Sequence, residues 1–336
     1  MLDTFLATIQ PMLTLFTFIA LGFLLFKVKI IPENGSKVLA KILTFAVCPA
    51  LSFTSMAKYF TFDNLFKHFV NLILGSFAVG IALIITLCLV GLFVKDKQSY
   101  ARGIYKYALT FGNMGYVGDP IVIALFGLEG LAFYKIATLP FLILIYTWGI
   151  TILVPNGGQK QSFVKNILNV PTVGLFVGMI AGITGLGNLI FNTQGLKFLA
   201  DGLTGLGNCM GPLAMLLAGV TVARFDIKKM LTNKKVYFAS ALRLVFIPAL
   251  VISIMFGIIT TTNIIFSISI DYSFLFLVFF AVATPLGMNT IVFPEAYGGD
   301  PSTGAGMTMI SHTLCVITIP LMYALLTLLF GPAPIF

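Results

Sequence analysis

The stretch TFGNMGYVGDPIVIALFG, from Thr110 to Gly127, lies inside a long apolar segment of the kind that spans a membrane as a helix. Five residues in its middle disfavour a continuous helix there: Gly112, Gly115, Gly118, Asp119 and Pro120. Glycine and proline weaken or end helices, and a carboxylate is costly in hydrocarbon. The stretch therefore predicts a helix that is broken at membrane depth.

The composition around this stretch is that of a membrane protein. The chain is 59% hydrophobic and 9% charged, whereas soluble domains carry roughly a quarter charged residues. Apolar runs recur along the whole chain, each long enough to cross about 30 Å of hydrocarbon. We predict an all-α polytopic membrane protein with ten spans at about 4–26, 37–57, 68–94, 103–127, 131–154, 170–191, 197–222, 236–260, 273–297 and 303–330.

Charge predicts the orientation of these spans, because Lys and Arg in short loops stay cytoplasmic. With the N-terminus outside, most of the 20 basic residues fall in cytoplasmic loops, and only Lys58, Lys67, Lys135 and Lys197 lie outside. Asp3 stands where a signal peptide would be positive, so the first span is expected to be retained. Both termini are then extracytoplasmic. The protein is expected in the plasma membrane. The net charge of +9 is explained by orientation and by anionic lipids, so no nucleic-acid partner is expected.

The spans divide into two sets of five, residues 1–154 and 170–336, joined by a short cytoplasmic linker at 155–169. An odd number of spans in each half places the second half upside down relative to the first. The halves share landmarks: FAVCPALSF corresponds to GNCMGPLAM, and GNMGYVGDP corresponds to ATPLGMNTIVFP. Paired interrupted helices in inverted halves indicate a secondary transporter.

Both breaks are expected near the middle of the bilayer. At about 1.5 Å per residue, Gly115 lies roughly 18 Å into the fourth span and Gly287 roughly 21 Å into the ninth. The freed backbone groups, together with the amides of Asn113 and Asn289, are predicted to bind an anion. The alternative is a pair of proline kinks in packed helices. The four cysteines form neither a disulfide framework nor a metal-binding pattern, and no cofactor or metal is expected.

Each of three ionisable residues within the spans has two possible roles. Asp119 either binds a coupling cation or proton, or caps the half-helix that starts near Pro120. His312 is expected to be a buried histidine that is hydrogen-bonded to a neighbouring helix, and the alternative is a proton relay. Arg243 is expected to reach the membrane surface with its long side chain, and otherwise to hold a substrate carboxylate bidentately.

Small residues recur in GLFVGMIAGITGLGNLIF and in GLTGLGNCMGPLAMLLAG. Such spacing lets membrane helices approach closely. We expect these two segments to belong to a rigid scaffold or to a dimer face.

The two stretches FGNMGYVGDPIVIALFG and ATPLGMNTIVFPEAYGGDPSTGAGMTMISHTLCVITIPLMYALL resemble the auxin efflux carrier family. That family includes the plant PIN-type auxin transporters and bacterial organic-acid permeases. The resemblance implies a homodimer with a 5+5 inverted repeat, in which broken helices 4 and 9 cross at the substrate site. It also implies scaffold helices 1, 2, 6 and 7, and a transport domain of helices 3–5 and 8–10 that moves as an elevator.

Individual residues carry this resemblance further. Asn113 and Pro120 match the first crossover of the family, and Pro285 matches the second. The chain departs from the plant members in its short linker. It also has Asp119 where those members look apolar, and Glu295 where they look basic. A bacterial-type organic-acid permease therefore fits better than an auxin exporter.

An enzyme is not expected. The segment YVGD is similar to the Gly-x-Gly-Asp motif of intramembrane aspartyl proteases, but that chemistry needs two carboxylates at one site. The other aspartates fall at span ends or in loops. We predict a secondary carrier of a small organic anion, a mono- or dicarboxylate, coupled to protons or sodium or uncoupled. A sodium-coupled symporter of the bile-acid type, and a channel or receptor with the same fold, remain open alternatives.

Overall fold

The computed structural model describes residues 2–94, 100–153, 170–225, 231–267, 272, 274–291, 294 and 302–331. Within these residues helices account for nearly all regular structure, which confirms the predicted all-α membrane class. Six described helices are long and apolar enough to cross a membrane, or seven if a pair bent by 90° counts as one span. This count covers only the described residues, and several of the ten predicted spans consist there of shorter helices separated by breaks. The predicted linker and Glu295 lie outside the described residues.

The first part of the chain contains α1 (Leu2–Lys27), α2 (Gly35–Ile42), η1 (Leu43–Val47), α3 (Cys48–Tyr59), α4 (Phe62–Phe93), α5 (Tyr100–Thr110), η2 (Met114–Gly118), α6 (Asp119–Ala137), α7 (Leu139–Leu144), η3 (Ile145–Gly149) and α8 (Ile150–Leu153). The second part contains α10 (Val170–Ile183), α11 (Leu186–Asn192), η5 (Gln194–Leu196), α12 (Lys197–Asn208), α13 (Met210–Ala223), α15 (Lys234–Ala241), η6 (Leu242–Phe246), α16 (Ile247–Phe266), α17 (Phe274–Val282) and α19 (Ser302–Phe330).

Three of the wide π-helical turns, η1, η2 and η6, have a common cause in the sequence. Each is followed by a helix whose second residue is proline: Pro49, Pro120 and Pro248. Proline has no N–H to donate to the carbonyl four residues earlier, and its ring collides with that carbonyl. A widened turn relieves the collision, and such turns are frequent at functional sites. Two of the three turns, η2 and η6, contribute to the site described below.

Helices α3 and α10 pack closely because glycine lines their contact. Gly174, Gly178 and Gly182 recur every four residues along α10 and face the segment from Pro49 in α3 to Phe60, which directly follows it. A Cβ atom at Gly178 would lie 2.8 Å from the main chain of Phe53. This confirms the close packing that the small-residue pattern predicts.

Replacing Gly178 with alanine is therefore expected to lower the unfolding temperature in detergent. The added methyl group overlaps the α3 backbone, and overpacking of this kind costs about 1–3 kcal/mol. Gly202→Ala is the matched control, since a Cβ there meets nothing within 4 Å. On α12 the same change gains about 0.5–1 kcal/mol of helix propensity, so it should raise the unfolding temperature. Equal shifts in the two variants would contradict the close packing of α3 and α10.

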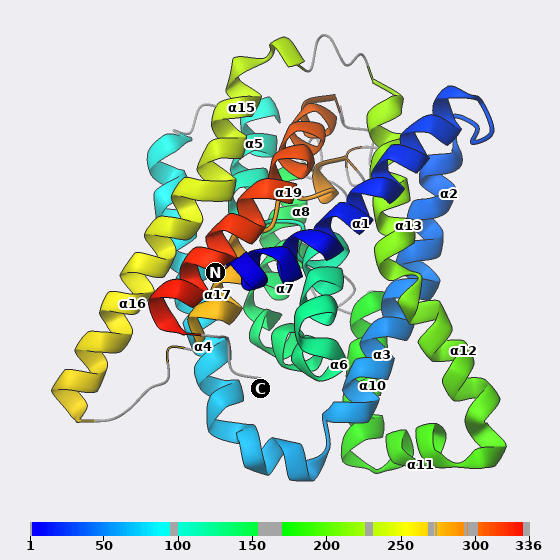
Figure 1. Cartoon of the computed structure of the whole chain (residues 1–336), viewed down its shortest axis with the longest axis vertical. Helices are drawn as coiled ribbons and strands as arrows, with labels where there is room; N and C mark the ends of the chain where they lie inside the picture. Colours follow the sequence, from blue (N-terminus) through cyan, green and yellow to red (C-terminus); the bar gives the residue numbers. More distant parts are fainter. Residues whose placement is uncertain are drawn as a thin grey trace.

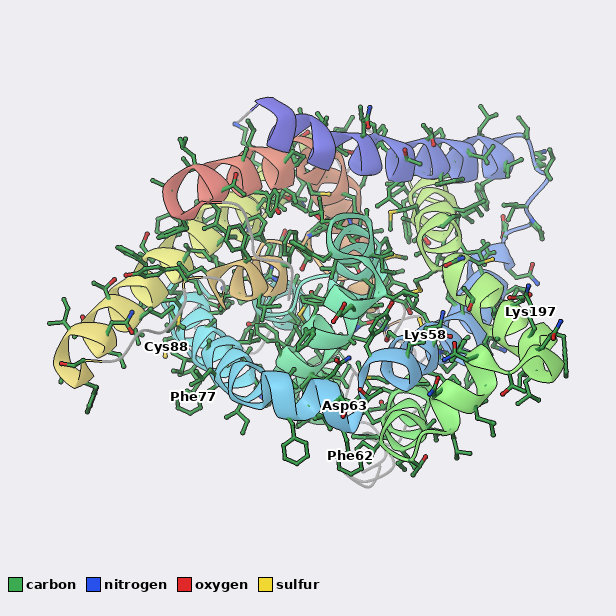
Figure 2. The ribbon with its side chains drawn as sticks, turned by 60° about the horizontal axis from the view of Figure 1, so that its bottom comes forward. Lys58, Phe62, Asp63, Phe77, Cys88 and Lys197 are labelled. Atoms are coloured by element: carbon green, nitrogen blue, oxygen red, sulfur yellow. The ribbon has the colours of Figure 1, made fainter. Side chains whose placement is uncertain are left out.

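The helices form two neighbouring groups with α1 lying across both. Helix α1 packs along α13 and also against α19 (Figure 1). On one side α3 contacts α10 and α12, and on the other α17 contacts α4 and α16. Phe77 and Cys88 on α4 point away from the body of the protein, as expected for a face turned to lipid (Figure 2). Lys58 and Lys197, predicted for one side of the membrane, both lie on the end of the molecule that Figure 2 brings forward.

Candidate functional site

The two predicted breaks meet in one crossing. Helix α5 ends at Thr110 and α17 ends at Val282, and the non-helical segments that follow them run antiparallel. Gly112 pairs with Leu286 in an isolated β-bridge, and the N–H of Asn113 donates to the Pro285 carbonyl over 2.7 Å. The two interruptions are therefore unwound segments that pair with each other, and not simple proline kinks in packed helices; that they bind an anion stays a prediction.

Glycine leaves room for close approach where the two segments touch. A Cβ atom at Gly112 would overlap Nη2 of Arg243 and Oγ1 of Thr284. A Cβ atom at Gly287 would lie 3.1 Å from the Phe111 carbonyl oxygen. The glycines that weaken the two spans as helices thus allow the backbones to cross.

Asn113 connects the first break to α19. Its side chain is 3% exposed, accepts from the Tyr116 N–H as the cap of η2, and contacts His312 with 3.0 Å between Nδ2 and Nε2. Nδ1 of His312 lies 2.8 Å from the Thr308 carbonyl, which can only accept. His312 therefore carries its proton on Nδ1, and its Nε2 accepts from Asn113. This confirms the expected buried histidine bonded to another helix.

Asn289 lies beside the second break, and its side chain is bonded to the first half of the chain. Its Nδ2 donates to the hydroxyl of Tyr107 over 2.9 Å. Tyr107 is fully buried, and its ring lies 4.9 Å from that of Phe111. Tyr107 was not among the residues predicted from the sequence, although it stands one turn before Phe111, which directly follows α5. The crossing thus has an asparagine from each broken helix, each bonded to the other half of the chain.

Asp119 forms an ion pair with Lys135 over 2.6 Å, and both side chains are largely buried. A straight helix would separate residues 16 positions apart by about 24 Å. The chain reverses at Gly127, whose positive φ of 69° favours glycine, and this brings Lys135 back to Asp119. The alternative in which Asp119 caps the half-helix is wrong, because that half-helix already starts at η2, where Asn113 is the cap. Lys135, which sequence analysis treated only as an orientation signal, is its partner.

Arg243 does not reach the membrane surface, so the expectation that it does is wrong. Its side chain is fully buried, and every nitrogen of its guanidinium donates to a main-chain carbonyl at the end of α5 or near the end of α17. The π-helical turn η6 presents it to the crossing. Its direct contact with a substrate stays a prediction.

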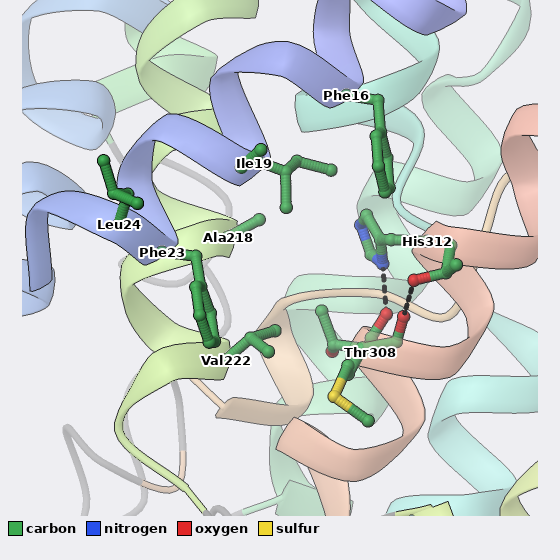
Figure 3. Close-up of a pocket in the computed structure, with 11 residues that line it drawn as sticks. Phe16, Ile19, Phe23, Leu24, Ala218, Val222, Thr308 and His312 are labelled. Carbon is green, nitrogen blue, oxygen red and sulfur yellow. Dashed lines mark hydrogen bonds between the residues drawn. The ribbon is translucent and has the colours of Figure 1, made fainter. Parts of the chain in front are cut away.

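A cavity of about 360 Å³ lies between α1, α13 and α19 and is lined by His312 (Figure 3), whose Nε2 contacts Asn113. Its walls are mainly apolar, with Phe16, Ile19 and Phe23 from α1 and Val222 from α13. The polar lining comes from α19, through His312, Thr308 and Thr313. The imidazole of His312 therefore contacts both the cavity and the crossing.

The start of η2, the half-helix that follows the first break, is also accessible. Gly115, in the first turn after the break, is exposed, and a Cβ atom there would meet nothing within 4 Å. The first N–H groups of a helix have no acceptor inside it and favour negative charge. Pro120 lies further along the same half-helix against Gly211 of α13, and Pro285 is buried in the crossing.

A helical membrane protein with two interrupted helices meeting at a polar crossing has the architecture of a membrane transporter. The family model described as "Membrane transport protein" matches residues 7–162 and 159–323. The chain belongs to this family, the auxin efflux carrier family, which confirms the resemblance seen in the sequence. Members of the family are transporters and not enzymes. No curated protein matches the chain.

Proposed function

We propose that this transporter is a secondary carrier of a small organic anion, a mono- or dicarboxylate, which binds at the crossing of the two broken helices. The observation that carries the proposal is the pairing of the two breaks through Gly112 and Leu286, with Asn113 and Asn289 beside them. Non-helical backbone at membrane depth is tolerated where it is buried in protein or lines a cavity.

The substrate carboxylate would bind at the open start of η2. The N–H groups near Gly115 and the amide of Asn113 supply donors there, and the positive end of the helix dipole favours an anion. Asn289 contributes from the second break, and Pro120 and Pro285 shape the two segments. His312 and the Asp119–Lys135 pair border the crossing and are proposed to gate transport or to couple it to protons or sodium.

The wider architecture is proposed to be ten spans in a 5+5 inverted repeat, working as a homodimer in the plasma membrane with both termini outside. The first and second halves, 1–154 and 170–336, each contribute one broken helix. The contacts among α1, α3, α10, α12 and α13 support a scaffold, and those among α4, α5, α17 and α19 support a bundle that carries the site. An elevator motion would slide the second group against the first along α1 and α13.

Uptake into proteoliposomes tests this function. We expect saturable uptake of at least one of radiolabelled malate, malonate and indole-3-acetate, accelerated by the same compound inside the vesicle. Such counterflow distinguishes a carrier from a channel. Runs with and without sodium and a pH gradient identify the coupling ion and test the bile-acid-type alternative. Flux that does not saturate, or no flux of any of these carboxylates, would contradict the proposal.

A further inference from the structure

Arg243 is placed where both broken helices end. Its Nη1 donates to the carbonyls of Leu109 and Thr110 over 3.0 and 3.2 Å. Its Nε donates to Thr284 over 3.1 Å, and its Nη2 to Ala281 over 3.4 Å. One side chain from η6 therefore joins the end of α5 to the end of α17.

These carbonyls need donors from outside their own helices. The last four carbonyls of a helix have no partner within it, and Leu109, Thr110 and Ala281 belong to such sets. In the bilayer core each unsatisfied group costs several kcal/mol, because no water is present to bond it. The planar fork of arginine carries five N–H donors and can serve several carbonyls at once, which the ammonium group of lysine cannot do with the same reach.

The guanidinium also changes the charge of the crossing. Each helix C-terminus is equivalent to about half a negative charge, so two ends meeting at one point amount to roughly one. Among the described residues no carboxylate forms an ion pair with Arg243. The charge of Arg243 is therefore balanced by the two helix ends, and without it those ends would repel an anion at the neighbouring half-helix start.

We propose that Arg243 is the positioning residue that makes the crossing selective for anions: it holds the ends of α5 and α17 together and cancels their negative charge. It acts through the backbone of the site, and this role replaces the direct contact with a substrate carboxylate that the sequence offered as an alternative, because every guanidinium nitrogen already donates to a carbonyl. This inference rests on the proposed function, because it presumes that a carboxylate binds at the crossing.

Thr284 offers a way to test the charge while leaving Arg243 in place. Its Oγ1 is buried without a hydrogen-bond partner and, like Nη2 of Arg243, lies against Gly112. In Thr284→Asp a carboxylate would stand beside the guanidinium and cancel its charge. Thr284→Asn introduces a side chain of nearly the same shape as aspartate but without its charge, so it is the matched control.

The measurement is the preference for a carboxylate over its neutral amide, from inhibition of uptake by malonate against malonamide and by indole-3-acetate against indole-3-acetamide. A unit charge about 10 Å away, at an effective dielectric constant of 20, corresponds to roughly a tenfold change in affinity. We expect Thr284→Asp and Arg243→Gln to lose about tenfold of the preference. Thr284→Asn and Arg243→Lys should keep it, although Arg243→Lys weakens binding of acid and amide alike.

The outcomes separate the inference from the function on which it rests. An unchanged preference in Thr284→Asp, or equal losses in Thr284→Asp and Thr284→Asn, would overturn the role of Arg243. If Arg243→Gln does not fold, the Thr284 pair decides the question alone. If the unchanged protein neither takes up nor binds any of these carboxylates, the proposed function itself fails.

Discussion

Replacing Asn113 with alanine is expected to reduce saturable carboxylate uptake by at least about tenfold. The change removes the cap of η2 and the partner of His312 Nε2 together. It leaves Nε2 of His312 without a partner in a buried position, which costs about 1–3 kcal/mol of stability. It also removes an amide donor from the proposed anion site, and the loss of about 1.4 kcal/mol of binding free energy there corresponds to a factor of ten in affinity. Initial rates of uptake into proteoliposomes at several substrate concentrations measure the effect.

The control for this prediction is Asn208→Ala, which makes the same chemical change at an exposed position on α12. It should leave both uptake and the unfolding temperature close to those of the unchanged protein. Asn113→Ala must be compared at equal amounts of folded protein, judged by gel filtration and thermal unfolding. Unchanged uptake in folded Asn113→Ala would move the substrate away from the crossing. Asn289→Ala, tested in the same way, would show whether the second asparagine contributes.

The elements that sequence analysis predicted well are those set by backbone chemistry. Glycine and proline together in GNMGYVGDP and in ATPLGMNT predict an interruption in each of these two helices, and both interruptions are present. The small residues of α10 likewise predict close packing against a neighbouring helix, and α10 packs closely against α3. The auxin efflux carrier family was identified from the same stretches, and the family match confirms it.

The partners of the charged side chains could not be predicted from the sequence, because they depend on how distant segments meet. Arg243 lies more than 130 positions from Leu109, so nothing local distinguishes a buried arginine bonded to carbonyls from one that reaches the membrane surface. The bond from Asn289 to Tyr107 is equally remote in the sequence. Lys135 is different: Gly127 stands midway between it and Asp119, and a reversal there could have suggested the pair.

Breaking the Asp119–Lys135 ion pair is expected to have the largest effect on stability. Asp119→Asn leaves a buried ammonium group without its partner, and Lys135→Met leaves a buried carboxylate. Removing one member of a buried pair costs about 3–5 kcal/mol, whereas replacing both members by neutral groups is often close to neutral. The double variant Asp119→Asn/Lys135→Met should therefore unfold at a higher temperature in detergent than either single variant. Lys197→Met, at an exposed lysine, should change little.

The same double variant separates a structural role of Asp119 from a role in coupling. If the pair only joins the two arms of α6 on either side of Gly127, the double variant should recover uptake along with stability. If Asp119 also carries the coupling proton or cation, the double variant should be stable and yet transport without dependence on the ion gradient. Single variants as stable as the unchanged protein would contradict the buried pair itself. Uptake that recovers with its gradient dependence intact would assign the coupling site to another group, of which His312, bonded to Asn113, is the next to test.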